Sequence, residues 1–256
     1  MKSQIKVFIL IALSLISIIS PKEVLELEFL KESDLKANNK SAQGVSGVPD
    51  FQSYVFTIQW GNTLCIPSAD CREKVKNWKK NVFTVHGLWP NGPNGQQLPT
   101  CNTLQKINFQ INDNNLQDQM NSHWPSLTGP NIKFWEHEYN KHGFCYSNKY
   151  GGSQTEFFRK GMELFLNFGF EDLVSDLMKN PSEEEVEISM DDLKNLIHER
   201  YPDAVFDIDC KLHNKTNYLQ ELRFYLNLDF MPFSPNKDRK KDCIFGPNVI
   251  LQKMLD

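Results

Sequence analysis

The segment 134–145 (FWEHEYNKHGFC) brings together side chains that transfer protons and bind anions. A helix turns about 100° per residue, so Lys141 would lie one turn after His137 on the same side. Glu138 and His142 would lie farther round in the same direction, at about 100° and 140° from His137, on the same helix face. A solvated face explains the lysine and the glutamate but not two histidines clustered beside them. We therefore expect a functional site here.

Cleavage of RNA without a metal ion is the chemistry that these residue types suit. A base must take the proton of the ribose 2′-hydroxyl, an acid must protonate the departing 5′-oxygen, and cations must stabilise the charge on the phosphate. Histidine, with an ordinary pKa of about 6.5, can serve as acid or base. Lys141 supplies fixed positive charge, and Glu138 can orient a histidine or raise its pKa.

A zinc site is the alternative that the same helix raises. His137 and Glu138 match the start of the H-E-x-x-H metalloprotease motif. That motif places its second histidine at position 141, where this chain has Lys141, and an ammonium group would repel a cation. His142 lies too far round the helix to share a ligand site with His137. We expect no metal and no other cofactor, and a zinc hydrolase is the runner-up hypothesis.

A second candidate segment is 83–90 (FTVHGLWP). His86, at the end of an expected strand and followed by Gly87, can point into a cleft from a rigid backbone. Trp89 offers a flat face on which a base can stack. On its own, the segment is equally typical of an ordinary strand end with a core tryptophan.

The elements that must position these residues mix strands and helices without regular alternation. Apolar and β-branched residues predict strands, and runs with helical spacing bounded by capping residues or glycine predict helices. The expected strands are 51–60, 81–85, 204–210 and 218–229, and the expected helices are 134–144, stopped by Gly143, 155–177, broken near Gly169, and one through Glu199 that Ser189 and Asp192 begin. Residues 90–99 are expected to be loop. This order favours an α+β fold with a central antiparallel sheet packed by several helices.

The two candidate segments together resemble the two active-site segments of the ribonuclease T2 family, the secreted and vacuolar or lysosomal acid ribonucleases. The segments carrying the likeness are 86–90 (HGLWP) and 134–145, in matching order and spacing. The resemblance extends from about Phe51 to near the C-terminus. It includes 124–127 (WPSL), the helix around Phe157 and Phe158, and 219–222 (LQEL).

This resemblance implies roles for the clustered residues. His86 and His142 form the acid–base pair, and we assign His142 as the base and His86 as the acid. His137 holds the phosphate, while Glu138 and Lys141 stabilise the charged transition state. The reaction would pass through a 2′,3′-cyclic phosphate before water opens it to a 3′-phosphate.

The resemblance also implies residues that contact the bases. Trp89 would stack on the base at the 5′ side of the cut, and Asn91 would hydrogen-bond it. Phe134 and Gln59 would contact the base on the 3′ side. Some family members carry an aromatic residue where this chain has Leu98, and an aspartate where it has Asn91. The base preference therefore stays open.

Six cysteines allow fifteen pairings, and their spacing alone does not choose among them. The resemblance implies Cys65–Cys71, Cys101–Cys145 and Cys210–Cys243. The second pair would tie the loop after His86 to the end of the histidine-bearing helix. Two sequons mark Asn39 and Asn214 as glycosylation candidates.

The first twenty residues have the pattern of an export signal. Lys2 and Lys6 precede an apolar run of 13 residues, 7–19, which is shorter than the roughly 20 residues of a spanning helix. A signal anchor is the alternative. Export leads to an oxidising compartment in which disulfides persist, so we expect a secreted protein or one of the lysosomal or vacuolar lumen, with no membrane attachment after signal removal.

The charge and organisation of the chain limit its partners. The formal net charge is −4, and it becomes −6 without residues 1–20, which hold two lysines and no acids. An acidic protein lacks the broad electrostatic attraction to phosphate that a protein needs in order to cover nucleic acid along its length. We expect a leader or flexible arm at 21–47 and one ribonuclease domain at 48–256, acting as a monomer with no obligate protein partner.

The sequence thus favours an endoribonuclease of single-stranded RNA over a non-catalytic secreted protein of the same fold. The distinguishing feature is the intact set of histidines, glutamate and lysine, which a catalytically dead relative would have lost. Because one histidine must be neutral and the other charged, we expect a bell-shaped pH dependence with a maximum at about pH 4–6.

Overall fold

A computed structural model of the chain describes residues 47–66, 81–92, 95–102, 106–178, 185–235 and 243–253. The predicted signal at 1–20, residues 21–46 of the predicted arm, and the sequon at Asn39 lie outside these ranges. The strands are β1 (Ser53–Trp60), β2 (Phe83–Asn91), β3 (Glu185–Ser189), β4 (Phe206–His213), β5 (Thr216–Leu226) and β6 (Asn248–Gln252). The helices are η1 (Gly61–Cys65), α4 (Asn114–His123), α5 (Asn131–Glu138), η3 (Tyr139–Gly143), α6 (Phe144–Tyr150), α7 (Gln154–Phe168), α8 (Phe170–Leu177) and α9 (Met190–Arg200).

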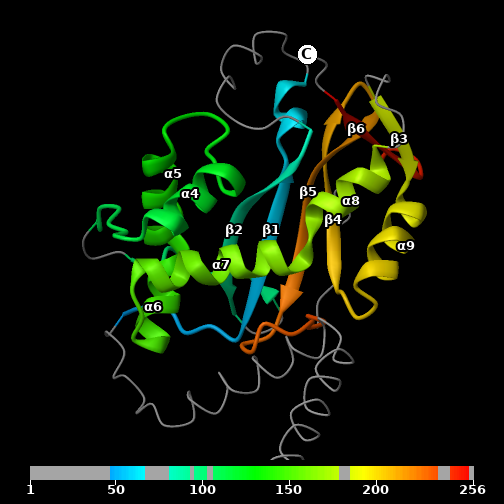
Figure 1. The fold of residues 1–256 in the computed structure, drawn as a ribbon. Helices are drawn as coiled ribbons and strands as arrows, with labels where there is room; N and C mark the ends of the chain where they lie inside the picture. Colours follow the sequence, from blue (N-terminus) through cyan, green and yellow to red (C-terminus); the bar gives the residue numbers. More distant parts are fainter. Residues whose placement is uncertain are drawn as a thin grey trace, which may run out of the picture. The chain divides into compact units, whose positions relative to one another are not determined.

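The strands form one sheet in the order β2-β1-β5-β6-β3, and β4 pairs with β5 (Figure 1). The pairs β1–β2, β1–β5, β3–β6 and β4–β5 are antiparallel, and β5 meets β6 in parallel at Tyr218 and Ile250. The predicted α+β class with a largely antiparallel central sheet is confirmed. The parallel contact was not predicted.

Alternation along β1 explains why this segment is a strand with two unlike faces. Successive side chains of a strand point to opposite faces of the sheet. Tyr54, Phe56, Ile58 and Trp60 are almost completely buried in the hydrophobic core. The intervening positions include the half-buried Gln59, so the face opposite the core is available for polar side chains.

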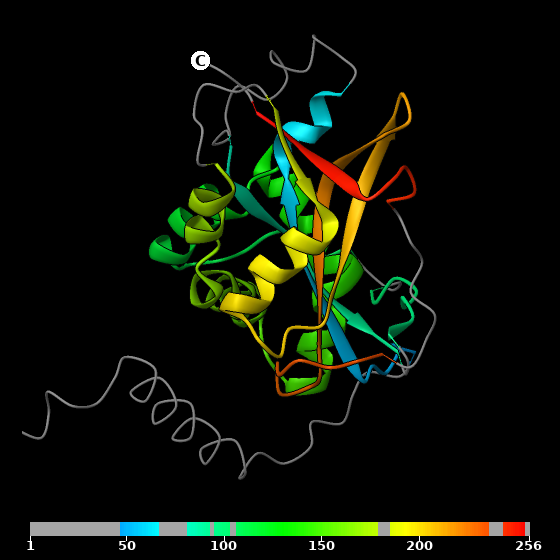
Figure 2. The same ribbon diagram turned by 90° about the vertical axis from the view of Figure 1, so that its right-hand side faces the viewer.

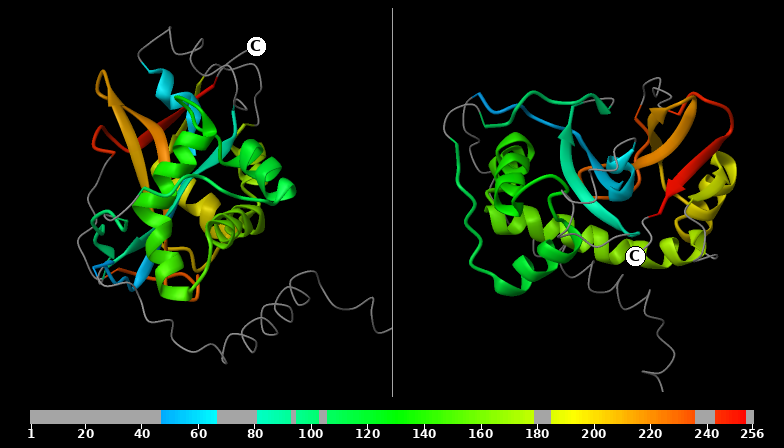
Figure 3. Two further views of the ribbon diagram at one scale, coloured as in Figure 1. Left: turned by 90° about the vertical axis from the view of Figure 1, so that its left-hand side faces the viewer. Right: turned by 90° about the horizontal axis from the view of Figure 1, so that it is seen from above.

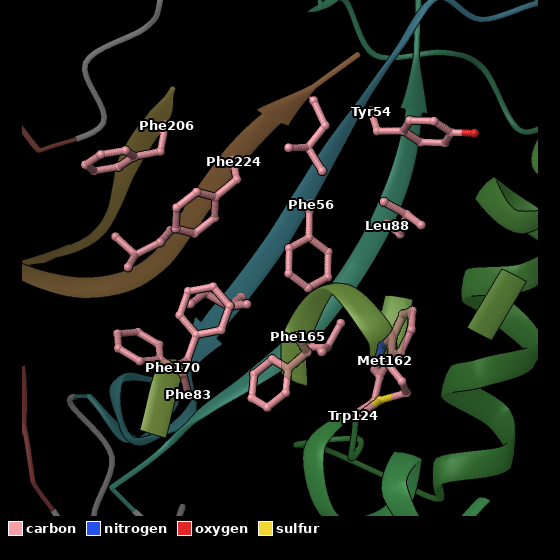
Figure 4. Close-up of a cluster of buried hydrophobic side chains, with 14 of the residues drawn as sticks. Tyr54, Phe56, Phe83, Leu88, Trp124, Met162, Phe165, Phe170, Phe206 and Phe224 are labelled. Atoms are coloured by element: carbon pink, nitrogen blue, oxygen red, sulfur yellow. The ribbon is translucent and has the colours of Figure 1, made fainter. Parts of the chain in front are cut away.

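Helix α7 runs across the core face of the sheet, and α8 follows α7 along the chain on the same face (Figures 1 and 3). A capping box formed by Ser153 and Glu156 begins α7, and Gly169, in the left-handed region at φ 57°, separates it from α8. The predicted break near Gly169 is therefore confirmed. Met162 and Phe165 of α7 lie in the core with sheet residues such as Phe56 (Figure 4).

Helix α9 lies beside β3, the strand at one edge of the sheet (Figure 2). The Ser189 side chain accepts a hydrogen bond from the Asp192 amide, which confirms the predicted start of this helix. Leu193 and Ile197 are completely buried, so the apolar side of α9 extends the same core.

Two predicted boundaries were wrong. The helix expected to stop at Gly143 continues through the π-helical turn η3 into α6. Gly143 has ordinary helical dihedral angles, φ −65° and ψ −25°, and a Cβ there would lie 2.6 Å from Tyr139 and 2.7 Å from Phe157. The glycine therefore permits close packing inside the helix. Residues 90–99 were expected to be loop, but strand β2 continues through Pro90 to Asn91. Proline is tolerated there because β2 is an edge strand.

Candidate active site

His86 is the extra residue of a β-bulge inside β2, and not the last residue of a strand as predicted. Thr57 pairs with Gly87 and Ile58 pairs with Val85, so His86 has no partner in β1. Bulges redirect side chains and often lie beside active sites. Here the bulge lets Val85 and Leu88, on either side of it, both point into the core.

Two tryptophans hold the backbone at this bulge. The Trp124 indole Nε1 donates a hydrogen bond to the carbonyl oxygen of His86 at 2.9 Å. The Trp135 indole in turn donates to the carbonyl oxygen of Trp124 at 2.8 Å. Both indoles are buried in the core, so α5 and the segment before it position His86 through its main chain.

The other candidate catalytic residues lie on α5 and η3. Glu138 and His142 are buried, at 3% and 5% exposure, whereas His137 is exposed and Lys141 is half-buried. π-Helical turns often occur at functional sites. In this turn the carbonyl oxygens of Asn140 and Lys141 accept hydrogen bonds from loop amides, namely those of Asn102 and Cys101.

The disulfide Cys101–Cys145 reinforces this connection between loop and helix. It and Cys210–Cys243 are the pairs that were predicted. Cys65 is also disulfide-bonded, but its predicted partner, Cys71, lies outside the described residues.

Trp89 connects the two histidines that the sequence paired. Its ring centroid lies 5.0 Å from that of His86 and 5.4 Å from that of His142. Its indole Nε1 donates to Oε2 of Glu138 at 2.9 Å. This indole passes directly over Gly87, where a Cβ would lie 2.1 Å from Nε1 and 2.6 Å from Oε2 of Glu138. The glycine is therefore required for the contact.

Glu221, which had no predicted role, contacts His86. Oε1 of Glu221, on β5, lies 2.5 Å from Nδ1 of His86. Two sequence signals marked its surroundings: the segment 219–222 (LQEL) forms part of the family resemblance, and the charged Glu221 and Arg223 alternate with the apolar Leu222 and Phe224 on a strand. Such alternation marks a polar face, but it does not indicate which histidine that face meets.

The surroundings of the two central histidines shift their pKa values in opposite directions. Burial, together with the charges of Lys141, His137 and His86, lowers the pKa of His142 to about 3. Burial alone would also lower the pKa of His86, but the hydrogen bond and charge of Glu221, with the charge of Glu138, raise it above its ordinary value of 6.5. Between these values His142 is neutral while His86 is charged, which is how an acid and a base are distinguished within one site.

The remaining charged residues shape the same site. Burial and the neighbouring Lys141 and His86 lower the pKa of His137. Burial raises the pKa of Glu138, against the opposing effects of His86, the Trp89 hydrogen bond and Lys141. The cluster therefore combines cationic groups with a buried carboxyl group that touches the tryptophan.

The four predicted base-contacting residues lie in different settings. Phe134 packs beside His86, with ring centroids 6.1 Å apart. Gln59 donates to the carbonyl oxygen of Val85 at 3.4 Å. Asn91 is buried, and its amide donates to the carbonyl oxygen of Gly95 at 3.3 Å, so in this structure it holds a loop. Their base contacts, and that of the half-buried Trp89, stay predictions.

Asn214 is exposed at the turn between β4 and β5, with φ 47°, and its glycosylation stays a prediction. Within the described ranges, no helix has the length and apolar character needed to cross a membrane. The same ranges contain no cluster of three or more His, Cys, Asp or Glu side chains arranged to hold a metal ion.

Comparisons with known proteins agree with the resemblance seen in the sequence. The sequence model of the ribonuclease T2 family matches residues 51–243. Ribonuclease DdI of Dictyostelium discoideum is 37% identical over 120 residues, which cover 46% of this chain and 51% of that protein. Ribonuclease T2 of Danio rerio is 32% identical over 157 residues, covering 59% of this chain and 58% of the relative. The matched part thus spans little more than half of these relatives.

Solved structures show the same fold. RNase NT, crystallised in complex with 5′-AMP, superposes with a TM-score of 0.64 at 21% identity, covering 80% of this chain and 100% of the other. A ribonuclease-related protein from Calystegia sepium superposes with a TM-score of 0.61 at 19% identity, covering 80% of this chain and 98% of the other.

Proposed function

The chain belongs to the ribonuclease T2 family, and we propose that it is an endoribonuclease that cleaves single-stranded RNA by proton transfer between substrate and two histidines. The proposal rests on one observation: the pKa of His86 is raised and that of His142 is lowered, while both rings contact Trp89. A single site thereby holds a neutral base and a charged acid at the same pH.

In the first step His142 acts as the base. It takes the proton of the ribose 2′-hydroxyl, and the 2′-oxygen attacks the adjacent phosphorus. His86, charged at the start, donates its proton to the 5′-oxygen as the bond from phosphorus to that oxygen breaks. The products are a 2′,3′-cyclic phosphate and a free 5′-hydroxyl. Water then opens the cycle to a 3′-phosphate, with the two histidines exchanging roles.

The neighbouring residues hold the phosphate and stabilise its charge. His137 is exposed beside the half-buried Lys141, and both can donate hydrogen bonds to phosphate oxygens. Glu138 is held by the Trp89 indole close enough to His86 to support its charged form. All these groups come from the protein, so the proposed reaction needs no metal ion or other cofactor.

We also propose that the protein acts in an oxidising compartment, either outside the cell or in a lysosomal or vacuolar lumen. The signal-like first twenty residues and the disulfides support this location. The RNase NT structure, determined with 5′-AMP, supports a nucleic-acid substrate. A monomer with no obligate protein partner remains our proposal for its assembly.

The test is cleavage of a single-stranded RNA at about pH 5, with EDTA present throughout. Wild type, His142→Ala and the matched control His198→Ala, which changes an exposed histidine of α9, are compared. We expect wild type and the control to leave cyclic or 3′-phosphate ends, and His142→Ala to lose the activity. An oxidised wild-type protein that cuts no RNA would indicate a non-catalytic family member. Activity that EDTA abolishes and zinc restores would indicate a zinc hydrolase.

A further inference from the structure

We propose that Glu221 is a positioning residue that holds the His86 ring through Nδ1 and directs Nε2 at the leaving 5′-oxygen. This inference rests on the proposed function, because it concerns how the acid of that reaction is held. Charged imidazole carries a proton on each nitrogen. With Nδ1 bound to Oε1 of Glu221 at 2.5 Å, the remaining proton to be donated is the one on Nε2.

The geometry of β1, β2 and β5 brings these two residues together across 135 positions of sequence. Gln59 of β1 pairs with Thr84 on one side and with Glu221 on the other. Val85 is buried in the core, so the next residue, His86, points to the opposite face of the sheet, the face of Gln59 and Glu221. From there its ring reaches Glu221 across β1.

A second bulge, in β5, lies next to Glu221. On β4, Asp209 pairs with Glu221 but Cys210 pairs with Leu219, so Gln220 has no partner. Leu219 and Leu222 are both completely buried in the core, and Glu221 between them is directed to the opposite face. Both residues of the His86–Glu221 contact therefore lie at or beside a bulge. Bulges often occur next to active sites, which supports a functional role for this contact.

The carboxylate of Glu221 is fully engaged. Its side chain is only 4% exposed, and a buried carboxylate is costly unless it is paired. Oε1 faces His86, while Oε2 accepts from Nε of Arg223 at 2.9 Å. Arg223 reaches Asp209 on β4 through Nη2 at 2.5 Å. The result is a chain of alternating charges, His86–Glu221–Arg223–Asp209, that keeps Glu221 in one place.

Charged groups from every neighbouring element act on His86. Glu221 and Arg223 approach from β5 and Glu138 approaches from α5, and His86 in turn repels the charged forms of His137 and His142. The two glutamates favour the charged ring, whereas Arg223 opposes it. Glu221 and Arg223 should therefore move the titration of His86 in opposite directions when each is neutralised.

The experiment measures two readouts on the full chain. The first is the NMR titration of the His86 ring, assigned by comparison with His86→Ala, and it needs no activity. The second is the pH profile of RNA cleavage. The variants are Glu221→Gln, Glu221→Asp, Arg223→Gln and the control Glu136→Gln, which changes a glutamate of similar burial that is paired with lysines on α5 and before it.

We expect Glu221→Gln to lower the pKa of His86 and to move the alkaline limb of the pH profile to lower pH. The variant should also reduce kcat by about 10- to 100-fold, as happens when the partner that orients a metal-bound histidine is lost. KM should change little. Glu221→Asp should restore part of kcat, Arg223→Gln should raise the pKa of His86, and Glu136→Gln should match wild type.

An unchanged His86 titration and an unchanged alkaline limb in folded Glu221→Gln would overturn the proposal. If that variant does not fold, a His86 pKa that fails to rise in Arg223→Gln overturns it instead. If wild type cuts no RNA, the proposed function fails, while the NMR titration still decides whether Glu221 holds His86.

Discussion

The indole nitrogen of Trp124 donates a hydrogen bond to the carbonyl oxygen of His86 at 2.9 Å. This contact joins the main chain of the bulged histidine to a residue that is completely buried among the aromatic side chains of α7. The core of the protein thus sets the position of His86 directly, without an intervening flexible side chain.

Replacement of Trp124 by phenylalanine should therefore lower activity beyond its effect on stability. The variant leaves the His86 carbonyl without its donor, which costs about 1–3 kcal/mol of unfolding free energy, and it frees the bulge to move. The control is Trp60→Phe, which removes a similar indole hydrogen bond, to the carbonyl oxygen of Gln252, far along the sheet. Denaturant unfolding should show a smaller loss for Trp60→Phe, because Nδ2 of Asn62 still donates to the Gln252 carbonyl oxygen at 3.0 Å, and only Trp124→Phe should lower kcat. Equal kcat values would argue against this role.

Gly87→Ala should uncouple Trp89 from Glu138. The new Cβ would lie 2.1 Å from Nε1 of Trp89, so the indole must move away. We expect kcat to fall by at least about 10-fold, because a small misplacement of catalytic groups has large effects on rate. Gly129→Ala is the control, since nothing lies within 4 Å of its Cβ position. Wild-type kinetics and unchanged tryptophan fluorescence in Gly87→Ala would contradict the geometry.

The pH dependence follows from the signs of the two histidine shifts. Activity requires neutral His142 and charged His86, so kcat/KM should rise as the pH increases through about 3, the pKa of His142. It should fall as the pH passes the pKa of His86, which lies above 6.5. The plateau then includes the acidic range predicted from the sequence. Rates that continue to increase above about pH 8 would contradict this assignment.

The disulfide Cys101–Cys145 should affect catalysis as well as stability. It joins residues 44 apart and Cys210–Cys243 joins residues 33 apart, so serine replacement of either pair should cost about 2–4 kcal/mol. Only loss of Cys101–Cys145 frees the loop that bonds to the carbonyl oxygens of η3. We expect kcat to fall for this double variant alone, when both are assayed below their unfolding temperatures.

Local sequence patterns predicted those parts of the fold that local physics determines. Gly169 ends α7 because its left-handed φ favours glycine, and Ser189 begins α9 through a hydrogen bond to the chain three residues on. The clustering of the histidines, the glutamate and the lysine on one helix face could also be predicted from the segment 134–145. Strands β3 and β6 are only five residues long, so their alternation gave weak signals and they were not predicted; helix α4 was not predicted either.

Features that depend on pairing between distant segments could not be predicted in the same way. The bulge at His86 exists only relative to Thr57 and Ile58 of β1, and the contact with Glu221 requires β1 to lie between β2 and β5. The π-helical turn coincides with loop amides that bond to Asn140 and Lys141. Each feature is set by tertiary contacts, so no local pattern encodes it.

The acid role of His86 and the base role of His142 can be separated with an RNA dinucleotide whose leaving 5′-oxygen is replaced by sulfur. A thiolate leaves without protonation, so this substrate needs the base but not the acid. On ordinary RNA, His86→Ala and His142→Ala should each be slower by roughly 10²–10⁴-fold. On the sulfur substrate, His86→Ala should recover most of the wild-type rate, and His142→Ala should remain slow. Recovery in His142→Ala, with His86→Ala still slow, would contradict the assigned roles.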